Sequence, residues 1–217
     1  MASEPCLLCG APGDANYSGC YVCDRKTAEE RERMEKYAGL LGGPRAWEQF
    51  HFERFKSDTE GAKKALAAAV GFDLSKNLYL HGPTGTGKSH LAVAAGRRWL
   101  RKVSVYTLKP AMLSREVRGV RSAIGEHEIM ERYANAGVLI LDDIGVAKDT
   151  EFSTALLYEL IDGRYMNKPG GLIVTSNLSL DELAAKLGDD RIPSRLAQMC
   201  RGNIVNMAGE PDRRVAK

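Results

Sequence analysis

The segment GPTGTGKS, residues 82–89, has the residue types and spacing of a phosphate-binding loop. Its glycines allow backbone N–H groups to converge on phosphate oxygens at the start of a helix. The Lys88 ammonium is expected to reach the β- and γ-phosphates, and the Ser89 hydroxyl to ligate Mg²⁺. The predicted nucleotide contacts are the loop and the residue after it, namely Gly82, Pro83, Thr84, Gly85, Thr86, Gly87, Lys88, Ser89 and His90.

Aromatic residues and histidines surround this loop. Phe50, Phe52 and Phe55 precede the first expected strand, where aromatic side chains pack into a core more often than they flank a nucleotide base. His81 and His90 bracket the loop, and a structural role suits both better than a catalytic one.

A pair of acidic residues follows the apolar run VLIL. Such a run indicates a strand buried on both faces, and ligands gather at the carboxyl ends of strands in open parallel sheets. Asp142 is therefore expected to hold Mg²⁺ through a water molecule, opposite Ser89, and Asp143 to orient or polarise the attacking water. The alternative is an acid pair that merely ends a strand, which the phosphate loop disfavours.

Two further features bear on whether the nucleotide phosphorylates a small molecule or changes the shape of the protein. Asn177 ends the apolar run LIVTS, where it could fix a water beside the γ-phosphate. Arg191 and Arg195 share one helical face and could reach a neighbouring subunit's nucleotide, an effect worth about 10³- to 10⁵-fold in rate. Two alternatives stay open: Asn177 caps the next helix, and the arginines pair with Asp189 or Asp190.

Four of the five cysteines form two C-x₂-C pairs, Cys6 with Cys9 and Cys20 with Cys23. Such pairs bring four thiolates onto one tetrahedral ion, and zinc with bonds of about 2.3 Å is the expected metal. A site filled by four cysteines is structural rather than catalytic. Redox pairs and an iron–sulfur cluster are the alternatives. Cys200 stands alone and is expected to be a small buried apolar residue.

Length and composition fit one α/β core with a small appendage, since the chain has 217 residues, of which 44% are hydrophobic. The net charge of +3 is too mild to indicate a nucleic-acid partner by itself. With no secretory signal and no apolar run of membrane-spanning length, a soluble cytoplasmic protein without a membrane partner is expected. The predicted division is a zinc-binding module at 1–26, a charged helical linker at 27–44 and an ATPase domain at 45–217.

Strand and helix patterns alternate after the linker. Strands are expected at 77–80, 103–108, 138–143, 171–177 and 203–207, with helices after the phosphate loop, in ALLYELIDGRY, in LDELAAKL and near 191–200. This alternation predicts a parallel sheet covered on both sides. Capping boxes are expected where Ser57 precedes Glu60 and where Ser179 precedes Glu182.

From about Trp47 onward the chain resembles the AAA+ ATPases of the bacterial helicase-loader and transposition-helper (DnaC/IstB-like) type. The matching segments are FHFERF, NLYLHGPTGTGKSHLAVAA, AGVLILDDIG, VTSNLSLDEL and RIPSRL. The resemblance implies an α/β fold, the AAA+ P-loop NTPase parallel sheet with flanking helices, here without a full lid domain because the chain ends 40 residues after Asn177. It also implies ATP as the nucleotide and a homo-oligomer in the ATP state.

The same resemblance assigns roles to individual residues. It implies that Asn177 is sensor 1, that Arg191 and Arg195 belong to the arginine-finger box, and that Arg213 occupies a sensor-2-like position. Asp143 departs from the glutamate usual at its position and is one methylene shorter. Its reach to the water is poorer, so slow turnover is expected, no more than a few per second without partners.

Two regions are candidates for binding partners. Lys109, Arg115, Arg118 and Arg121 form a loose basic stripe, which in the resembling family contacts single-stranded DNA; an ordinary solvated helix face is the alternative. The four-cysteine segment has one aromatic residue, Tyr17, and no basic residue between its pairs, which is little for nucleic-acid binding. The resemblance implies that this module grips the replicative helicase instead.

The leading functional hypothesis is an ATP-dependent DNA replication protein that loads the replicative helicase onto single-stranded DNA. ATP binding and slow hydrolysis to ADP and phosphate would switch its assembly. One alternative is an IstB-like transposition helper that binds DNA and targets a transposase. A small-molecule kinase is the other, and the Asn177 and arginine features disfavour it.

Overall fold

The computed structural model of the chain describes residues 49–100, 102–120, 122–145 and 151–214. Its centre is a five-stranded sheet in the order β2-β3-β4-β1-β5, with every pair of neighbouring strands parallel. The strands are β1 (Asn77–His81), β2 (Val105–Leu108), β3 (Val138–Ile144), β4 (Gly171–Ser176) and β5 (Ile204–Asn206). The predicted parallel sheet and its five strands are confirmed, with β2 starting two residues later than expected.

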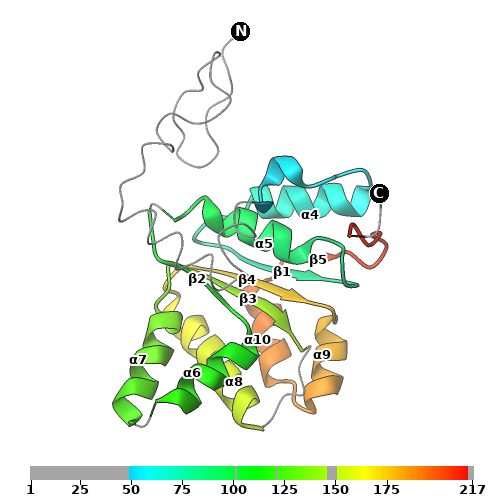
Figure 1. The fold of residues 1–217 in the computed structure, drawn as a ribbon. Helices are drawn as coiled ribbons and strands as arrows, with labels where there is room; N and C mark the ends of the chain where they lie inside the picture. Colours follow the sequence, from blue (N-terminus) through cyan, green and yellow to red (C-terminus); the bar gives the residue numbers. More distant parts are fainter. Residues whose placement is uncertain (1–48, 101, 121, 146–150, 215–217) are drawn as a thin grey trace.

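Helices cover both faces of the sheet (Figure 1). One face carries α4 (Glu60–Val70) and α5 (Lys88–Arg97), preceded by the short 3₁₀ helix η1 (Phe52–Arg54). The opposite face carries the other helices, which are α6 (Pro110–Gly119), α7 (Ala123–Ala134), α8 (Glu151–Asn167), α9 (Leu180–Leu187) and α10 (Arg191–Met199). The sequence pattern did not predict α7, because only two of its residues, Met130 and Tyr133, are buried.

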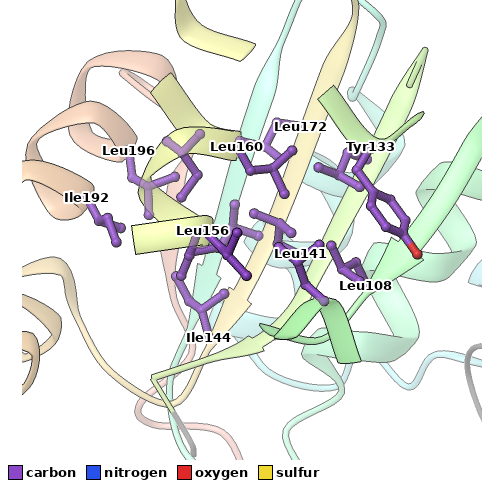
Figure 2. Close-up of a cluster of buried hydrophobic side chains, with 14 of the residues drawn as sticks. Leu108, Tyr133, Leu141, Ile144, Leu156, Leu160, Leu172, Ile192 and Leu196 are labelled. Atoms are coloured by element: carbon purple, nitrogen blue, oxygen red, sulfur yellow. The ribbon is translucent and has the colours of Figure 1, made fainter. Parts of the chain in front are cut away.

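Two hydrophobic clusters fill the spaces between the sheet and its helical layers. Leu139 and Leu141 of β3 face the cluster beneath α6–α10, part of which Figure 2 shows, whereas Val138 and Ile140 face the cluster beneath α4 and α5. A strand whose successive side chains enter different cores must be apolar at every position. The apolar run before Asp142 is therefore a consequence of the three-layer architecture.

The helix starts test the two predicted capping boxes. Ser179 and Glu182 form a complete capping box at the start of α9, as expected. The box predicted for Ser57 and Glu60 is wrong, because α4 begins later: Thr59 is its N-cap, and the Thr59 hydroxyl accepts a hydrogen bond from the Ala62 N–H at 3.1 Å. A nearby serine and threonine offer the same capping chemistry, so sequence spacing alone could not choose between them.

A buried arginine joins the layers far from the phosphate loop. The Arg164 side chain on α8 is 1% exposed, and its guanidinium donates to the carbonyl oxygens of Tyr133, Ala134, Ala136 and Gly171 at 2.9–3.1 Å. Burial lowers the Arg164 pKa to about 10. Because these carbonyls come from the end of α7 and the start of β4, Arg164 fixes α7 against the sheet.

Candidate nucleotide-binding site

The residues of the candidate site lie at the carboxyl ends of three adjacent strands. In the sheet, β4 lies between β1 and β3, and all three run in the same direction. The phosphate loop follows β1, the acid pair ends β3, and Asn177 follows β4. The sheet thus brings together at one edge three motifs that are separated by almost a hundred residues of sequence.

The loop conformation depends on glycine. Gly82 and Gly87 have φ angles of +140° and +98°, which side chains other than hydrogen rarely allow. Space is also restricted, since a Cβ at Gly87 would lie 2.6 Å from Phe55 Cε2 and one at Gly82 would lie 2.7 Å from the Met207 carbonyl carbon. Both motif glycines are therefore required by backbone geometry and by close packing.

Lys88 begins α5 and is buried inside the loop. Its ammonium donates hydrogen bonds to the carbonyl oxygens of Gly82 at 2.7 Å and Pro83 at 2.6 Å. Burial lowers the pKa of Lys88, while the carboxylates of Asp143 and Asp142 act in the opposite direction. The ammonium is thus held within the loop and close to the acid pair.

Ser89 and Asp142 meet directly. The Ser89 hydroxyl donates to Asp142 Oδ1 at 2.6 Å, and the Thr175 hydroxyl on β4 donates to the same oxygen at 2.8 Å. Asp142 is only 3% exposed. A hydroxyl beside a fixed carboxylate is a donor set that suits Mg²⁺, so these two residues fit the predicted ion.

Asp143 adopts an uncommon backbone conformation, with φ at +60°. Its N–H donates to the Thr175 hydroxyl at 2.9 Å, and its side chain is 36% exposed and lines the cavity described below. The same threonine therefore orients both acids. Aspartate tolerates the left-handed region better than longer residues do, which gives a backbone reason for the shorter acid at this position.

Lys109 is a site residue that sequence reasoning assigned elsewhere. It was expected in the basic stripe, but its ammonium lies 3.5 Å from Asp142 Oδ2 and 3.4 Å from Asp143 Oδ2. Lys109 directly follows β2, whose last residue Leu108 pairs with Leu141 of β3. The position of Lys109 directly after a strand is the sequence signal for a site residue. The signal is informative only once β2 and β3 are known to be neighbours.

A cavity of about 580 Å³ opens over the loop, a size typical of small-molecule sites. Of the residues predicted to contact the nucleotide or to act on it, those that line the cavity are Thr84, Gly85, Gly87, Lys88, Ser89, His90, Asp143, Asn177 and Arg213. Gly82, Pro83, Thr86 and Asp142 are not among its lining residues, although each bonds to a lining side chain. The loop backbone, Lys88 and the cavity volume together fit a nucleoside triphosphate.

Asn177 is among the residues that line this cavity. Its Oδ1 is buried and has no hydrogen-bond partner among the described residues. Buried polar atoms are normally satisfied, and exceptions often mark a place for a ligand or water. Asn177 does not cap the next helix, because Ser179 does.

The segment before α4 forms another wall. Phe50 and Phe55 line the cavity, and Phe55 also belongs to the buried cluster beneath α4 and α5. The His90 ring packs edge-on against both at 5.3 and 5.7 Å, and its Nε2 lies 2.6 Å from the His51 carbonyl oxygen. Burial lowers the pKa of His90. His90 therefore ties this wall to α5, which is the structural role expected for it.

Arg213 reaches the site from the carboxy-terminal segment. Its N–H donates to the Gly85 carbonyl at 2.9 Å and its Nε to the Thr86 carbonyl at 3.2 Å. The guanidinium carbon lies 4.7 Å from the centre of the Phe55 ring. The residue expected at a sensor-2-like position thus lies at the cavity, next to the exposed Arg214.

Arg191 and Arg195 are not at this cavity. Arg191 pairs with Asp189 at 2.6 Å and lies over the Tyr158 ring, so one of the alternative partners weighed for it is present. Arg195 pairs instead with Asp162 on α8 at 2.8 Å and lies over the ring of the neighbouring Tyr165. Both guanidinium groups lie on a surface formed by α8 and α10.

Of the other residues named in the sequence analysis, some have a described position and some lie outside the described ranges. Arg115 and Arg118 are exposed on α6, and Cys200 is buried as predicted. Arg121 and the four amino-terminal cysteines lie outside the described residues, as do the zinc module and the charged linker. Within the described ranges, no cluster of three or more His, Cys, Asp or Glu residues is placed to hold a metal ion, and no helix is long and apolar enough to cross a membrane.

Comparisons with known proteins agree with this geometry. The sequence model of the family described as "IstB-like ATP binding protein" matches residues 22–216. The replicative helicase loader DnaC of Escherichia coli (strain K12) is 26% identical over 185 residues, which are 79% of this chain and 74% of that protein. The insertion sequence IS21 putative ATP-binding protein of Pseudomonas aeruginosa is 27% identical over 168 residues, covering 75% of this chain and 62% of that protein.

A solved structure shows the same fold. The crystal structure of the DnaC helicase loader matches with a TM-score of 0.63 at 22% identity, over 74% of this chain and 97% of that one. Together with the strand order and the phosphate loop, this likeness confirms the predicted AAA+ type of α/β fold.

Proposed function

The chain belongs to the IstB-like ATP-binding protein family, and on that basis we propose that it is an ATP-dependent DNA replication protein. In this proposal it loads the replicative helicase onto single-stranded DNA, while ATP binding and slow hydrolysis switch its assembly. The similarity to replicative helicase loaders over most of the chain supports this choice within the family.

One observation carries the proposal: a single cavity is lined by the phosphate loop, Asp143 and Asn177, and its lining residue Ser89 is hydrogen-bonded to Asp142. Lys88 would leave the loop carbonyls and bind the β- and γ-phosphates. Ser89 and Asp142 would hold Mg²⁺, which neutralises charge on the phosphate oxygens. Asp143 and the unpartnered Asn177 amide oxygen would orient the attacking water.

The arginines on α10 support an assembly with shared sites. Arg191 and Arg195 are held on the outer surface by Asp189 and Asp162 and do not line the cavity of their own chain. We propose that on assembly they reach the γ-phosphate bound by the neighbouring protomer. Such a contact would make hydrolysis depend on the homo-oligomer that forms in the ATP state.

Two further surfaces would bind the partners. The exposed Arg115 and Arg118 on α6 would contact the DNA backbone, whereas Lys109 is engaged with the acid pair. In the proposed division, residues 1–26 form the zinc-binding module, 27–44 the linker and 45–217 the ATPase domain. The amino-terminal module would bind the helicase. Cys6, Cys9, Cys20 and Cys23 would hold the structural zinc.

The transposition helper is the second candidate, favoured by the similarity to the IS21 putative ATP-binding protein. The two functions differ in DNA form and in partner. A loader should bind single-stranded DNA and the replicative helicase, whereas a transposition helper should coat duplex DNA and recruit a transposase.

Transfer of the host helicase onto a closed single-stranded DNA circle tests the proposal. With ATP, the full chain should raise the amount of circle-bound helicase at least about tenfold over helicase alone, and Lys88→Ala should not. The matched control is Lys63→Ala, which removes an exposed lysine of α4 paired with Glu60. ATP-dependent coating of duplex DNA without helicase transfer would instead support the transposition helper.

A further inference from the structure

The carboxy-terminal segment after β5, residues 207–214, returns to the phosphate loop. The Met207 N–H donates to the His81 carbonyl at 2.7 Å, and the Arg213 N–H donates to the Gly85 carbonyl at 2.9 Å. In Figure 1 this segment, drawn in red, lies beside α4. Both arginines of this segment, Arg213 and Arg214, line the cavity, and of the two Arg213 is the less exposed, with 13% of its side chain accessible against 67% for Arg214.

Glu210 is a buried carboxylate in this segment. Its side chain is 3% exposed, and its Oε2 accepts hydrogen bonds from the Thr59 hydroxyl at 2.5 Å and from Arg213 Nη2 at 3.1 Å. Its Oε1 lies so close to α4 that a Cβ added at Gly61 would be 2.3 Å away. The carboxylate therefore sits at the amino-terminal end of α4, where the helix dipole stabilises negative charge.

The Arg213 guanidinium is held on several sides. Besides Glu210, it bonds to the Thr86 carbonyl at 3.2 Å and to Asp58 Oδ1 at 3.2 Å, and it stacks on Phe55. These contacts are unequal, because the Asp58 side chain is 63% exposed and that of Glu210 is 3% exposed. Hydrogen bonds between buried charged groups orient side chains much more strongly than solvated pairs do.

We propose that Glu210 is a positioning residue: by joining the N-cap of α4 to Arg213, it sets the guanidinium at the cavity for contact with nucleotide phosphates. This inference rests on the proposed ATP binding. Glu210 is not among the residues that line the cavity, so its effect on affinity is expected to pass through Arg213. A nearby negative charge could alternatively weaken anion binding, and the two effects have opposite signs.

A double-mutant cycle tests this role. The Kd of the full chain for a non-hydrolysable ATP analogue with Mg²⁺ is measured by calorimetry for the wild type, Glu210→Ala, Arg213→Ala and the double variant. Arg213→Ala should weaken binding about 10- to 100-fold, since a charge-assisted contact to phosphate is lost. Glu210→Ala should weaken it about 5- to 10-fold, and adding it to Arg213→Ala should change Kd by less than about twofold.

Asp58→Ala is the matched control, because it removes the exposed carboxylate from the same guanidinium, and it should change Kd by less than about twofold. If a single variant is unfolded at the assay temperature, Glu210→Gln or Arg213→Lys replaces it. Unchanged or tighter binding by Glu210→Ala, or an equal loss in the Arg213→Ala background, would overturn the proposal. A wild-type chain that binds no nucleotide would refute the proposed function, and this inference with it.

Discussion

The cavity over the phosphate loop and the outer surface of α8 and α10 both present arginine and carboxylate side chains, but they hold them differently. At the cavity, Asp142 is 3% exposed and receives two hydrogen bonds, and Lys88 is buried among loop carbonyls. On the outer surface, the Arg191 side chain is 63% exposed and its partner Asp189 lies two residues away. The first region is assembled by the sheet, whereas the second combines the local Arg191–Asp189 pair with the Arg195–Asp162 pair between α10 and α8.

This difference suggests what each region can do alone. A site whose charged groups are buried and hydrogen-bonded within one chain can bind a nucleotide in that chain alone. Ion pairs near the surface, such as the exposed pair of Arg191 and the half-buried pair of Arg195, contribute little to stability, so their groups can change partners at small cost. The cavity is therefore expected to govern nucleotide binding in each protomer, and the α10 arginines to act only where a second protomer supplies the nucleotide.

The largest effect should come from the cavity. Lys88→Ala is expected to reduce ATP hydrolysis about 10³-fold or more, because both binding and charge stabilisation at the phosphates are lost. Steady-state phosphate release, with Lys63→Ala as the control, measures this. Hydrolysis that survives in Lys88→Ala within about tenfold would place nucleotide chemistry somewhere other than this cavity.

The second-largest effect should come from the α10 surface, and it should lower the rate of hydrolysis without lowering nucleotide affinity. Removing both guanidinium groups by Arg191→Ala and Arg195→Ala is expected to slow hydrolysis about 10²- to 10³-fold. The Kd of the isolated protomer for ATP and its free energy of unfolding should change little, the latter by about 1 kcal/mol or less. A loss of nucleotide affinity by the isolated protomer equal to the loss in rate would contradict the division of roles.

The smallest effect concerns His90 in the wall of the cavity and the pH dependence of the free energy of unfolding. Burial holds the His90 pKa below its ordinary value of 6.5, so the unfolded chain takes up a proton first as the pH falls. Stability from neutral His90 is complete above about pH 6.5 and decreases as the pH falls towards the folded pKa. Urea unfolding at several pH values should show a shallower decrease for His90→Gln than for the wild type; equal decreases would mean that His90 does not contribute.

The features that could be predicted from the sequence are those formed by residues close together in the chain. The phosphate loop, the acid pair and Asn177 each belong to a short contiguous pattern at a strand end, and their meeting follows from a parallel sheet. The capping box at Ser179 is equally local, and it formed as expected.

The remaining features depend on contacts between distant segments. Lys109 reaches the acid pair only because β2 lies beside β3, and Glu210 reaches Thr59 across about 150 residues of sequence. The pairing of Arg195 with Asp162 likewise requires α8 and α10 to be packed together. No periodicity or motif spacing specifies such contacts, because they follow from strand order and layer packing.

Mixing two inactive variants tests the shared site most directly. Lys88→Ala has a defective phosphate loop but keeps both α10 arginines. The variant carrying Arg191→Ala and Arg195→Ala keeps an intact phosphate loop but lacks both arginines. If one protomer completes the site of the next, the mixture should hydrolyse ATP at least about tenfold faster than the sum of the two variants assayed separately. A mixture no faster than that sum, at concentrations where the wild type assembles, would contradict the account.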